Sequence, residues 1–301
     1  MTCAVKLYQG SFGRVALMDS DRGLMTHAHS QCHVLIKAGG ADTTFQVGAE
    51  KYALNEDTAI LVNAWVPHSK IHRASDGRSR VLALYIEPEW LSGLCPDAPS
   101  SAIPGFFSAS CVVLPPFIRQ LADHLVAVTF GESDTDPAQW ERALAELMTA
   151  IVHAFAVKRP CSPVFGVGHR RIGDYRIARA ISFMKEHLGE SFSSEQWARM
   201  HSLSRPHFFS LFKECTTLSP ALYMNMLRME AALDRLADNS VSINNLSDSL
   251  GFSVPHHFTR FFRSTLGIPP SEYRRTVAIL DQPPVPAYLL KARAPRSAMY
   301  R

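Results

Sequence analysis

The 301-residue sequence contains no apolar run of the ~18 residues that a membrane-spanning helix requires. Its first residues, MTCAVKLYQGSFGR, lack an apolar core of signal-peptide length, so we expect a cytoplasmic protein without a membrane partner. Only 19% of the residues are charged and 47% are hydrophobic, which is typical of a globular protein. The length is sufficient for two domains of ordinary size.

Other motifs are missing as well. The six cysteines are scattered and form no C-x-x-C pair, which argues against a disulfide framework or a zinc ribbon. The sequence has no Ser-His-Asp arrangement, no carboxylate pair with a catalytic rationale and no glycine-rich loop for phosphate. We therefore expect neither enzyme activity nor a cofactor.

Charge is distributed unevenly along the chain. Residues 1–169 carry 13 basic and 16 acidic side chains, whereas residues 170–301 carry 18 and 11. The basic excess therefore lies in the second half. An imbalance of this size is also compatible with an ordinary solvated surface, so it does not by itself establish a nucleic-acid partner.

The first half changes its hydrophobic period once. Between residues 14 and 87, short alternating segments such as RVALMD, CHVLIKA and RVLALYIE are separated by glycine-containing turns, which predicts a β-sandwich or barrel. Beyond residue 116 the period of about 3.6 predicts two amphipathic helices. Their apolar faces comprise Phe117, Leu121, Leu125 and Val128, then Trp140, Leu144, Leu147, Ile151 and Phe155. These faces could cover the barrel or each other, or form a dimer interface.

The second half contains a repeat. HFFSLFKECTTLSPALY begins at His207, and HFTRFFRSTLGIPPSEY begins 50 residues later at His257. Each copy follows a short helix and a tight turn, so the pattern predicts two helix-turn-helix units joined by one long helix. The helix N-caps are predicted at Ser193, Ser204, Ser219, Ser242 and Ser253.

Residues 175–278 resemble the DNA-binding domain of the AraC/XylS family of transcriptional regulators. The resemblance rests on LSRPHFFSLFK, LSPALY, LGFSVPHHFTRFFR and IPPSEYRR. It implies an α+β two-domain protein with an N-terminal cupin-like β-barrel carrying the two amphipathic helices, and a C-terminal all-α domain. It also implies promoter DNA, a small-molecule effector and RNA polymerase as partners, and often a homodimer. The expected boundaries are 1–158 for the effector and dimerisation domain, 159–174 for a linker, 175–278 for the DNA-binding domain and 279–301 for a flexible basic tail.

The first unit departs from the family pattern. It has His201-Ser202 where the family usually has Ala-Gly, and Thr217 where the family has glycine. If these positions require a left-handed backbone, each non-glycine residue costs about 1 kcal/mol.

The resemblance assigns the DNA-reading positions on the two second helices. They are Pro206, Phe209 and Ser210 in the first unit, and Pro255, His256, Thr259 and Arg260 in the second. We expect Arg260 to read guanine through two hydrogen bonds, because only a guanidinium offers that geometry here. Phosphate contacts are expected from Arg205, Lys213, Arg263 and Arg274.

Four histidines mark the barrel. His27 and His29 share a strand face, and His33 and His68 complete an order similar to the cupin metal signature, although His33 stands where that signature has Glu. Four imidazoles suit zinc, iron, copper or nickel. Since the resembling family mostly uses the barrel as a metal-free pocket, no metal is favoured. The expected effector pocket comprises His27, His29, His33, Phe45, Trp65, His68 and Tyr85.

These observations predict an effector-controlled, sequence-specific DNA-binding regulator, and the resemblance favours an activator. Two alternatives remain open. One is a constitutive regulator whose barrel only dimerises, and the other is a metal-dependent cupin enzyme fused to a helical domain.

Overall fold

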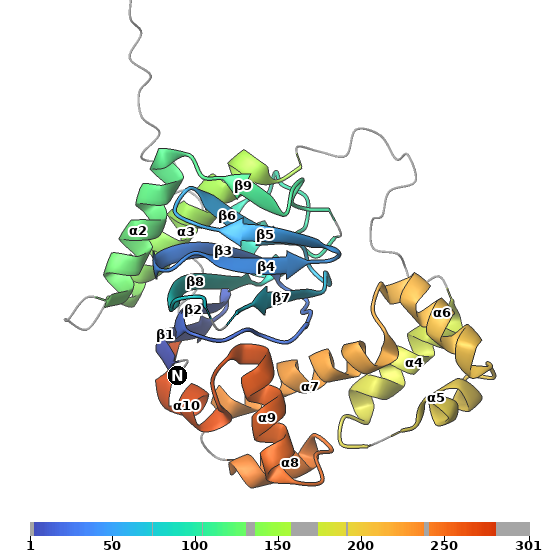
Figure 1. The fold of residues 1–301 in the computed structure, drawn as a ribbon. Coiled ribbons are helices and arrows are strands. Elements are labelled where there is room, and N and C mark those ends of the chain that lie inside the picture. Colours follow the sequence, from blue (N-terminus) through green and yellow to red (C-terminus); the bar gives the residue numbers. More distant parts are fainter. Residues whose placement is uncertain are drawn as a thin grey trace, which may run out of the picture.

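The computed structural model describes residues 3–73, 75–103, 105–130, 136–157, 174–190, 192–237 and 241–280. A strand-rich N-terminal domain is followed by a helical C-terminal domain (Figure 1), which confirms the predicted α+β class. Most of the predicted linker and residues 281–301 of the predicted tail lie outside the described residues. No helix in the described ranges is long and apolar enough to cross a membrane.

Two sheets form the N-terminal domain. The larger has the strand order β10-β1-β2-β8-β3-β6-β9 and the smaller has the order β5-β4-β7. The strands are β1 (Cys3–Gly10), β2 (Gly13–Ser20), β3 (Cys32–Gly40), β4 (Thr43–Val47), β5 (Glu50–Leu54), β6 (Thr58–Val62), β7 (His68–Ile71), β8 (Ser79–Ile86), β9 (Cys111–Val113) and β10 (Val277–Leu280). The sequence segments quoted above coincide with β2, β3 and β8, which are central in the larger sheet.

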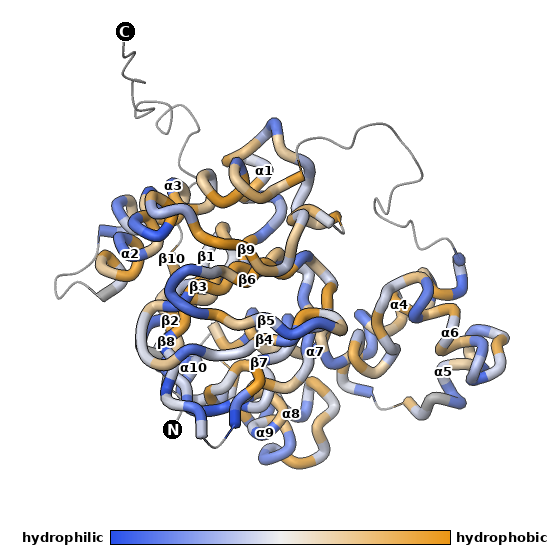
Figure 2. Tube along the Cα trace, turned by 45° about the horizontal axis from the view of Figure 1, so that its top comes forward, coloured by the Kyte–Doolittle hydropathy of each residue, from blue (hydrophilic) through white to orange (hydrophobic). Residues whose placement is uncertain are grey.

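The alternation along β8 explains the layers. Leu82 and Leu84 point toward the helices, whereas Val81, Ala83 and Tyr85 point toward the smaller sheet. Both faces of the larger sheet are therefore buried. Figure 2 shows the strongly hydrophobic β6 and β9 beneath α1.

Three helices cover the outer face of the larger sheet: α1 (Pro88–Leu94), α2 (Pro116–Phe130) and α3 (Pro137–Phe155). The buried face predicted for α3 is confirmed for Trp140 and Leu144. In α2 one residue of the predicted face is wrong: Phe117 is 55% exposed and its neighbour Ile118 is buried instead, whereas Leu125 is buried as predicted. The two helices thus cover the sheet, which is one of the alternatives that the sequence left open for their apolar faces.

Seven helices follow among the described residues 174–280: α4 (Tyr175–Glu186), α5 (Ser194–Met200), α6 (Arg205–Thr216), α7 (Pro220–Ala237), α8 (Ile243–Ser249), α9 (Pro255–Leu266) and α10 (Pro270–Thr276). The long α7 runs from the α4–α6 group to the α8–α10 group beside the barrel (Figure 1).

The predicted caps hold at most helix starts. Ser193 forms a complete capping box with Gln196, and the hydroxyls of Ser219 and Ser242 accept from Leu222 N and Asn245 N. Ser204 occupies the N-cap position of α6, but its side chain makes no cap hydrogen bond. The prediction for α9 is wrong, because Val254 rather than Ser253 is its N-cap.

The C-terminal end of the helical domain joins the barrel. β10 pairs in parallel with β1, with Leu7 opposite Val277 and Gly10 opposite Leu280. The predicted tail therefore starts two residues too early, since 279 and 280 belong to this strand. Tyr273 Oη also donates to Gln9 Oε1 at 2.8 Å, so α10 is fixed to the first strand.

Candidate DNA interface and effector cavity

The two helix-turn-helix units repeat one core. Phe208 and Phe212 of α6 are buried, as are Phe258 and Phe262 of α9. Each second phenylalanine meets a tyrosine of the following helix edge-on, at 5.5 Å in the first unit and 5.6 Å in the second. The repeated residues thus build the scaffold that presents the outward faces of α6 and α9.

The turns of the two units differ. Four residues separate α5 from α6, and five separate α8 from α9. Ser202 and Thr217 have φ angles of 56° and 65°, and Gly251 and Gly267 take the corresponding roles with 77° and 85°. The left-handed backbone expected at the two departures from the family pattern is therefore present.

The outward side of α6 offers few groups that can read bases. Pro206 and Ser210 are exposed, and Phe209 is half-buried. Arg205 pairs with Glu195 at 3.4 Å and lies over the Phe209 ring, 5.8 Å from its centroid. The Phe209 ring is thus partly engaged within its own unit.

The outward side of α9 is richer in polar groups. His256 and Arg260 are exposed, while Pro255 and Thr259 are half-buried. The Thr259 hydroxyl donates to the Pro255 carbonyl at 3.2 Å, so its hydrogen is already used within the helix. Arg260 therefore presents an exposed guanidinium on this side of α9, and its reading of guanine stays a prediction.

The expected phosphate contacts divide into two groups. Lys213, like Arg205, is exposed at the surface of α6, and Arg263 is half-buried. Arg274 instead donates from Nη2 to the Val241 carbonyl at 2.7 Å, which ties α10 to the start of the second unit. Its guanidinium therefore has a structural role in this arrangement.

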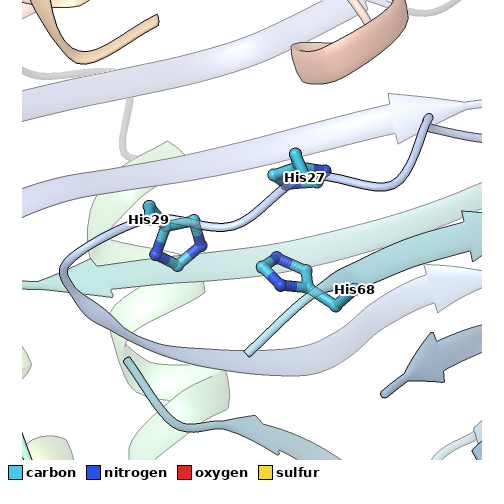
Figure 3. A group of neighbouring side chains, drawn as sticks. All are labelled: His27, His29 and His68. Atoms are coloured by element: carbon cyan, nitrogen blue, oxygen red, sulfur yellow. The ribbon is translucent and has the colours of Figure 1, made fainter. Parts of the chain in front are cut away.

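The predicted histidines come together. An antiparallel bridge pairs His27 with His68, and their ring centroids are 4.3 Å apart. His29 lies 4.9 Å from His68, and Figure 3 shows these three rings close together, from the segment before β3 and the start of β7. His33 stacks on Tyr85 at 3.9 Å and places its Nδ1 3.3 Å from His68 Nε2.

Burial disfavours the charged form of all four rings. Burial lowers the pKa of His27 to about 4 and that of His68 to about 3. Burial, with repulsion from the neighbouring rings, places the pKa of His29 and of His33 well below the ordinary value.

The aromatic residues predicted to line the pocket separate. Phe45 and Tyr85 line a small cavity of about 50 Å³ between the sheets, together with His33 and His68. Trp65 is outside that cavity, because its ring stacks on Tyr223 of α7 at 5.8 Å with the planes 3° apart. The prediction of Trp65 as a pocket wall is therefore wrong, and this residue joins the two domains instead.

A larger cavity of about 360 Å³ lies between the domains. The barrel contributes Arg14, Tyr85 and Glu87, and the segment from Met25 to Gln31 that holds His27 and His29. The helical domain contributes side chains of α7 and α9: Leu222, Asn225, Met226, Met229, Glu230, Leu233, Asp234, Phe261, Thr265 and Leu266. Its volume is within the range of small-molecule sites.

The charged residues that line this cavity were not predicted from the sequence. Burial raises the pKa of Glu87, Glu230 and Asp234, and the Arg14 guanidinium lies 4.0 Å from the centre of the Tyr85 ring. Glu230 and Asp234 are four residues apart beside the apolar stripe of α7, and this spacing could have indicated a polar site on that helix. No comparable signal marked Arg14 or Glu87.

The segment from Met25 to Gln31 is bonded to both helices that line the cavity. Ser30 donates from its backbone N and from Oγ to Glu230 Oε1, at 3.3 and 2.8 Å. Met25 N donates to the carbonyl of Ser264 in α9 at 2.8 Å. Hydrogen bonds therefore connect this segment directly to α7 and to α9.

Two family models match the chain. A model described as an AraC-like ligand binding domain matches residues 14–150, and one described as a helix-turn-helix domain matches residues 197–276. The chain belongs to the AraC family of transcriptional regulators.

Individual relatives resemble this AraC-family chain at low identity. The HTH-type transcriptional activator RhaS of Escherichia fergusonii is 28% identical over 52% of this chain and 53% of its own length. RhaS of an Enterobacter species is 23% identical over 82% of this chain and 86% of its own. The MmsAB operon regulatory protein of Pseudomonas aeruginosa is 30% identical over 36% of this chain and 35% of its own length. In the first and third relatives the matched segment thus spans about half of the protein or less.

The fold also resembles a solved structure. Apo ToxT from Vibrio cholerae, in a variant form, aligns with a TM-score of 0.53 at 12% identity, covering 89% of this chain and 98% of ToxT. A ToxT structure with an unsaturated fatty acid bound aligns with the same TM-score.

Proposed function

We propose that the chain binds promoter DNA sequence-specifically through α6 and α9 and regulates transcription in response to an effector held in the interdomain cavity. The observation that carries this proposal is that one cavity is lined both by the barrel and by α9, a helix expected to read DNA. An effector there contacts both domains, so it can favour one domain arrangement over another.

The charges favour a positively charged effector. Glu87, Glu230 and Asp234 outnumber Arg14 among the charged groups that line the cavity, and the histidines there are neutral. Two of these acids belong to α7, so neutralising them would act on the helix that joins the two DNA-binding units.

Binding-site selection from random DNA with the full chain tests the DNA-binding part. We expect a two-part consensus with its halves about 34 Å apart along the duplex, as two major-groove helices require, and stronger specification in the half read by α9. Recovery of unenriched DNA would contradict the proposal.

Thermal-shift screening of cationic and anionic metabolites tests the effector, with Asp234→Asn as the variant and exposed Asp123→Asn as the control. We expect cationic compounds to stabilise the wild type and the control more than Asp234→Asn. DNA affinity that no compound changes would favour a constitutive regulator.

Several finer properties belong to the same proposal. We expect transcription activation through RNA polymerase, a cytoplasmic location and no enzyme activity, as in the resembling family. We also expect a homodimer through α2, because Phe117 is exposed on a helix whose other face is packed on the sheet. Sedimentation of wild type and Phe117→Glu tests this, and a monomeric wild type would refute it.

A further inference from the structure

Three histidines are arranged as ligands for one ion: His27 and His29 line the interdomain cavity, and His68 lines the small cavity between the sheets. A ring nitrogen from each of His27, His29 and His68 lies within 4.8 Å of those from the other two. Reciprocal backbone hydrogen bonds of 3.0 and 2.9 Å hold the main chains of His27 and His68 side by side.

Hydrogen bonds determine which nitrogen of each ring is available. The Nδ1 atoms of His27, His29 and His68 lie 2.8–2.9 Å from the backbone carbonyls of Met25, Gln31 and Val66, respectively. A carbonyl only accepts, so each Nδ1 carries the hydrogen and each Nε2 of the neutral ring carries a lone pair. Histidines that bind metals are usually held in this way by their second nitrogen.

Few hydrogen-bond donors reach the Nε2 atoms of these histidines. Nε2 of His27 and of His29 is buried and has no hydrogen-bond partner within the part of the chain that the structure describes. His68 Nε2 has one contact, with Nδ1 of His33, which must then be the donor. His33 Nε2 is in turn a buried acceptor without a described partner. Acceptors left in this state are costly, and a metal ion would satisfy those of His27 and His29 at once, with His68 Nε2 exchanging its hydrogen bond from His33 for the ion.

We propose that His27, His29 and His68 bind one divalent first-row transition ion, such as Zn²⁺, and that this ion is the positively charged effector. The effector role of the ion rests on the proposed function above. Imidazole nitrogen suits this group of metals, and three protein ligands leave a coordination position open for water or a small molecule in the cavity.

Binding would move the segment that carries two of the ligands. Zinc–nitrogen bonds of 2.0–2.1 Å place tetrahedral nitrogens about 3.4 Å apart, so binding would draw together any pair of the three ring nitrogens that lies further apart than this within the 4.8 Å limit. The same segment is bonded through Met25 to Ser264 of α9 and through Ser30 to Glu230 of α7. Closure on the ion therefore pulls on both helices of the DNA-binding domain.

The test is a titration of metal-free full-length protein with Zn²⁺ by calorimetry, repeated with Co²⁺ to observe tetrahedral visible absorption. The variants are His27→Gln, His29→Gln and His68→Gln, and the control is His124→Ala, an exposed histidine of α2. We expect one ion per wild-type chain and an affinity loss of at least about 100-fold in each ligand variant, since lost supporting groups alone cost 10–100-fold. The control should bind like the wild type.

Wild-type protein that binds no ion at micromolar Zn²⁺ would overturn the site, and this outcome does not depend on any variant folding. Unchanged binding in all three ligand variants, with circular dichroism confirming their fold, would also overturn it. Affinity for the DNA site obtained by selection, measured with and without Zn²⁺, tests the effector role separately from metal binding. A change supports the ion as effector, and an unchanged affinity with the ion bound refutes that role while leaving DNA recognition intact.

Discussion

Thr217 ends α6 in a left-handed backbone conformation, where the second unit has Gly267 at the end of α9. An L-residue in this conformation costs about 1–2 kcal/mol, and glycine avoids that cost. Glycine also gives the unfolded chain more freedom, which costs about 0.4–1 kcal/mol. Thr217 is exposed and its hydroxyl donates only to the preceding carbonyl, so Thr217→Gly removes no tertiary contact. We expect a net gain of about 0.5–1 kcal/mol in the free energy of unfolding.

Thermal and urea unfolding of the full chain measure this gain. For a chain of 301 residues, about 1 kcal/mol moves the midpoint by roughly 1.5–2 °C. Thr217→Ala is the matched control, because alanine loses the hydroxyl but keeps the left-handed strain. Gly267→Ala should shift the midpoint downward. If Thr217→Gly is no more stable than Thr217→Ala, the strain at this helix end is not what the φ angle of 65° indicates.

Three further predictions address DNA reading, pH dependence and domain contact. Arg260→Ala should relax discrimination at one base pair by about 1–3 kcal/mol, and an unchanged consensus in binding-site selection would contradict this. Burial raises the pKa of Glu230 above its unfolded value, so its ionised form destabilises the fold at high pH and this cost disappears as pH falls through the folded pKa. The stability of Glu230→Gln relative to wild type should therefore increase from pH 4 to pH 7.5 in thermal melts, and a constant difference would refute the burial effect. Trp65→Ala should remove about 0.5–1.5 kcal/mol of stacking on Tyr223 and speed hydrogen exchange near the start of α7, whereas unchanged exchange would show that the stack does not hold the domains.

Local pattern was sufficient where a segment has a strong period and clear ends. The central strands β2, β3 and β8 are buried on both faces and read as apolar segments between turns. The duplicated helices were predictable because the same phenylalanines recur at Phe208 and Phe258. In α2 a one-residue displacement placed Phe117 on the wrong face, since Phe117 and Ile118 are adjacent and both apolar.

Contacts between the domains could not be read from local pattern. The last two residues of β10 precede a proline-rich stretch and were assigned to the tail, but the strand includes them because the edge of β1 offers unpaired backbone groups. The same limit applies to Trp65, which suits a pocket wall by composition but stacks on a helix 158 positions further along the chain. Burial of Glu230 likewise depends on Ser30, which is distant in sequence.

For the histidines, the sequence spacing predicts that the side chains are close together but not which ring nitrogens face one another. H-x-H places two imidazoles on one side of an extended segment, and this much follows from the backbone. Whether they can bind a metal depends on which ring nitrogen faces the cluster, and the carbonyls of Met25 and Gln31 decide this by binding Nδ1. A backbone carbonyl is present at every residue, so no substitution pattern in the sequence could have marked these two. The expectation of a metal-free pocket came from family resemblance, whereas the proposed metal site rests on these hydrogen bonds of the rings.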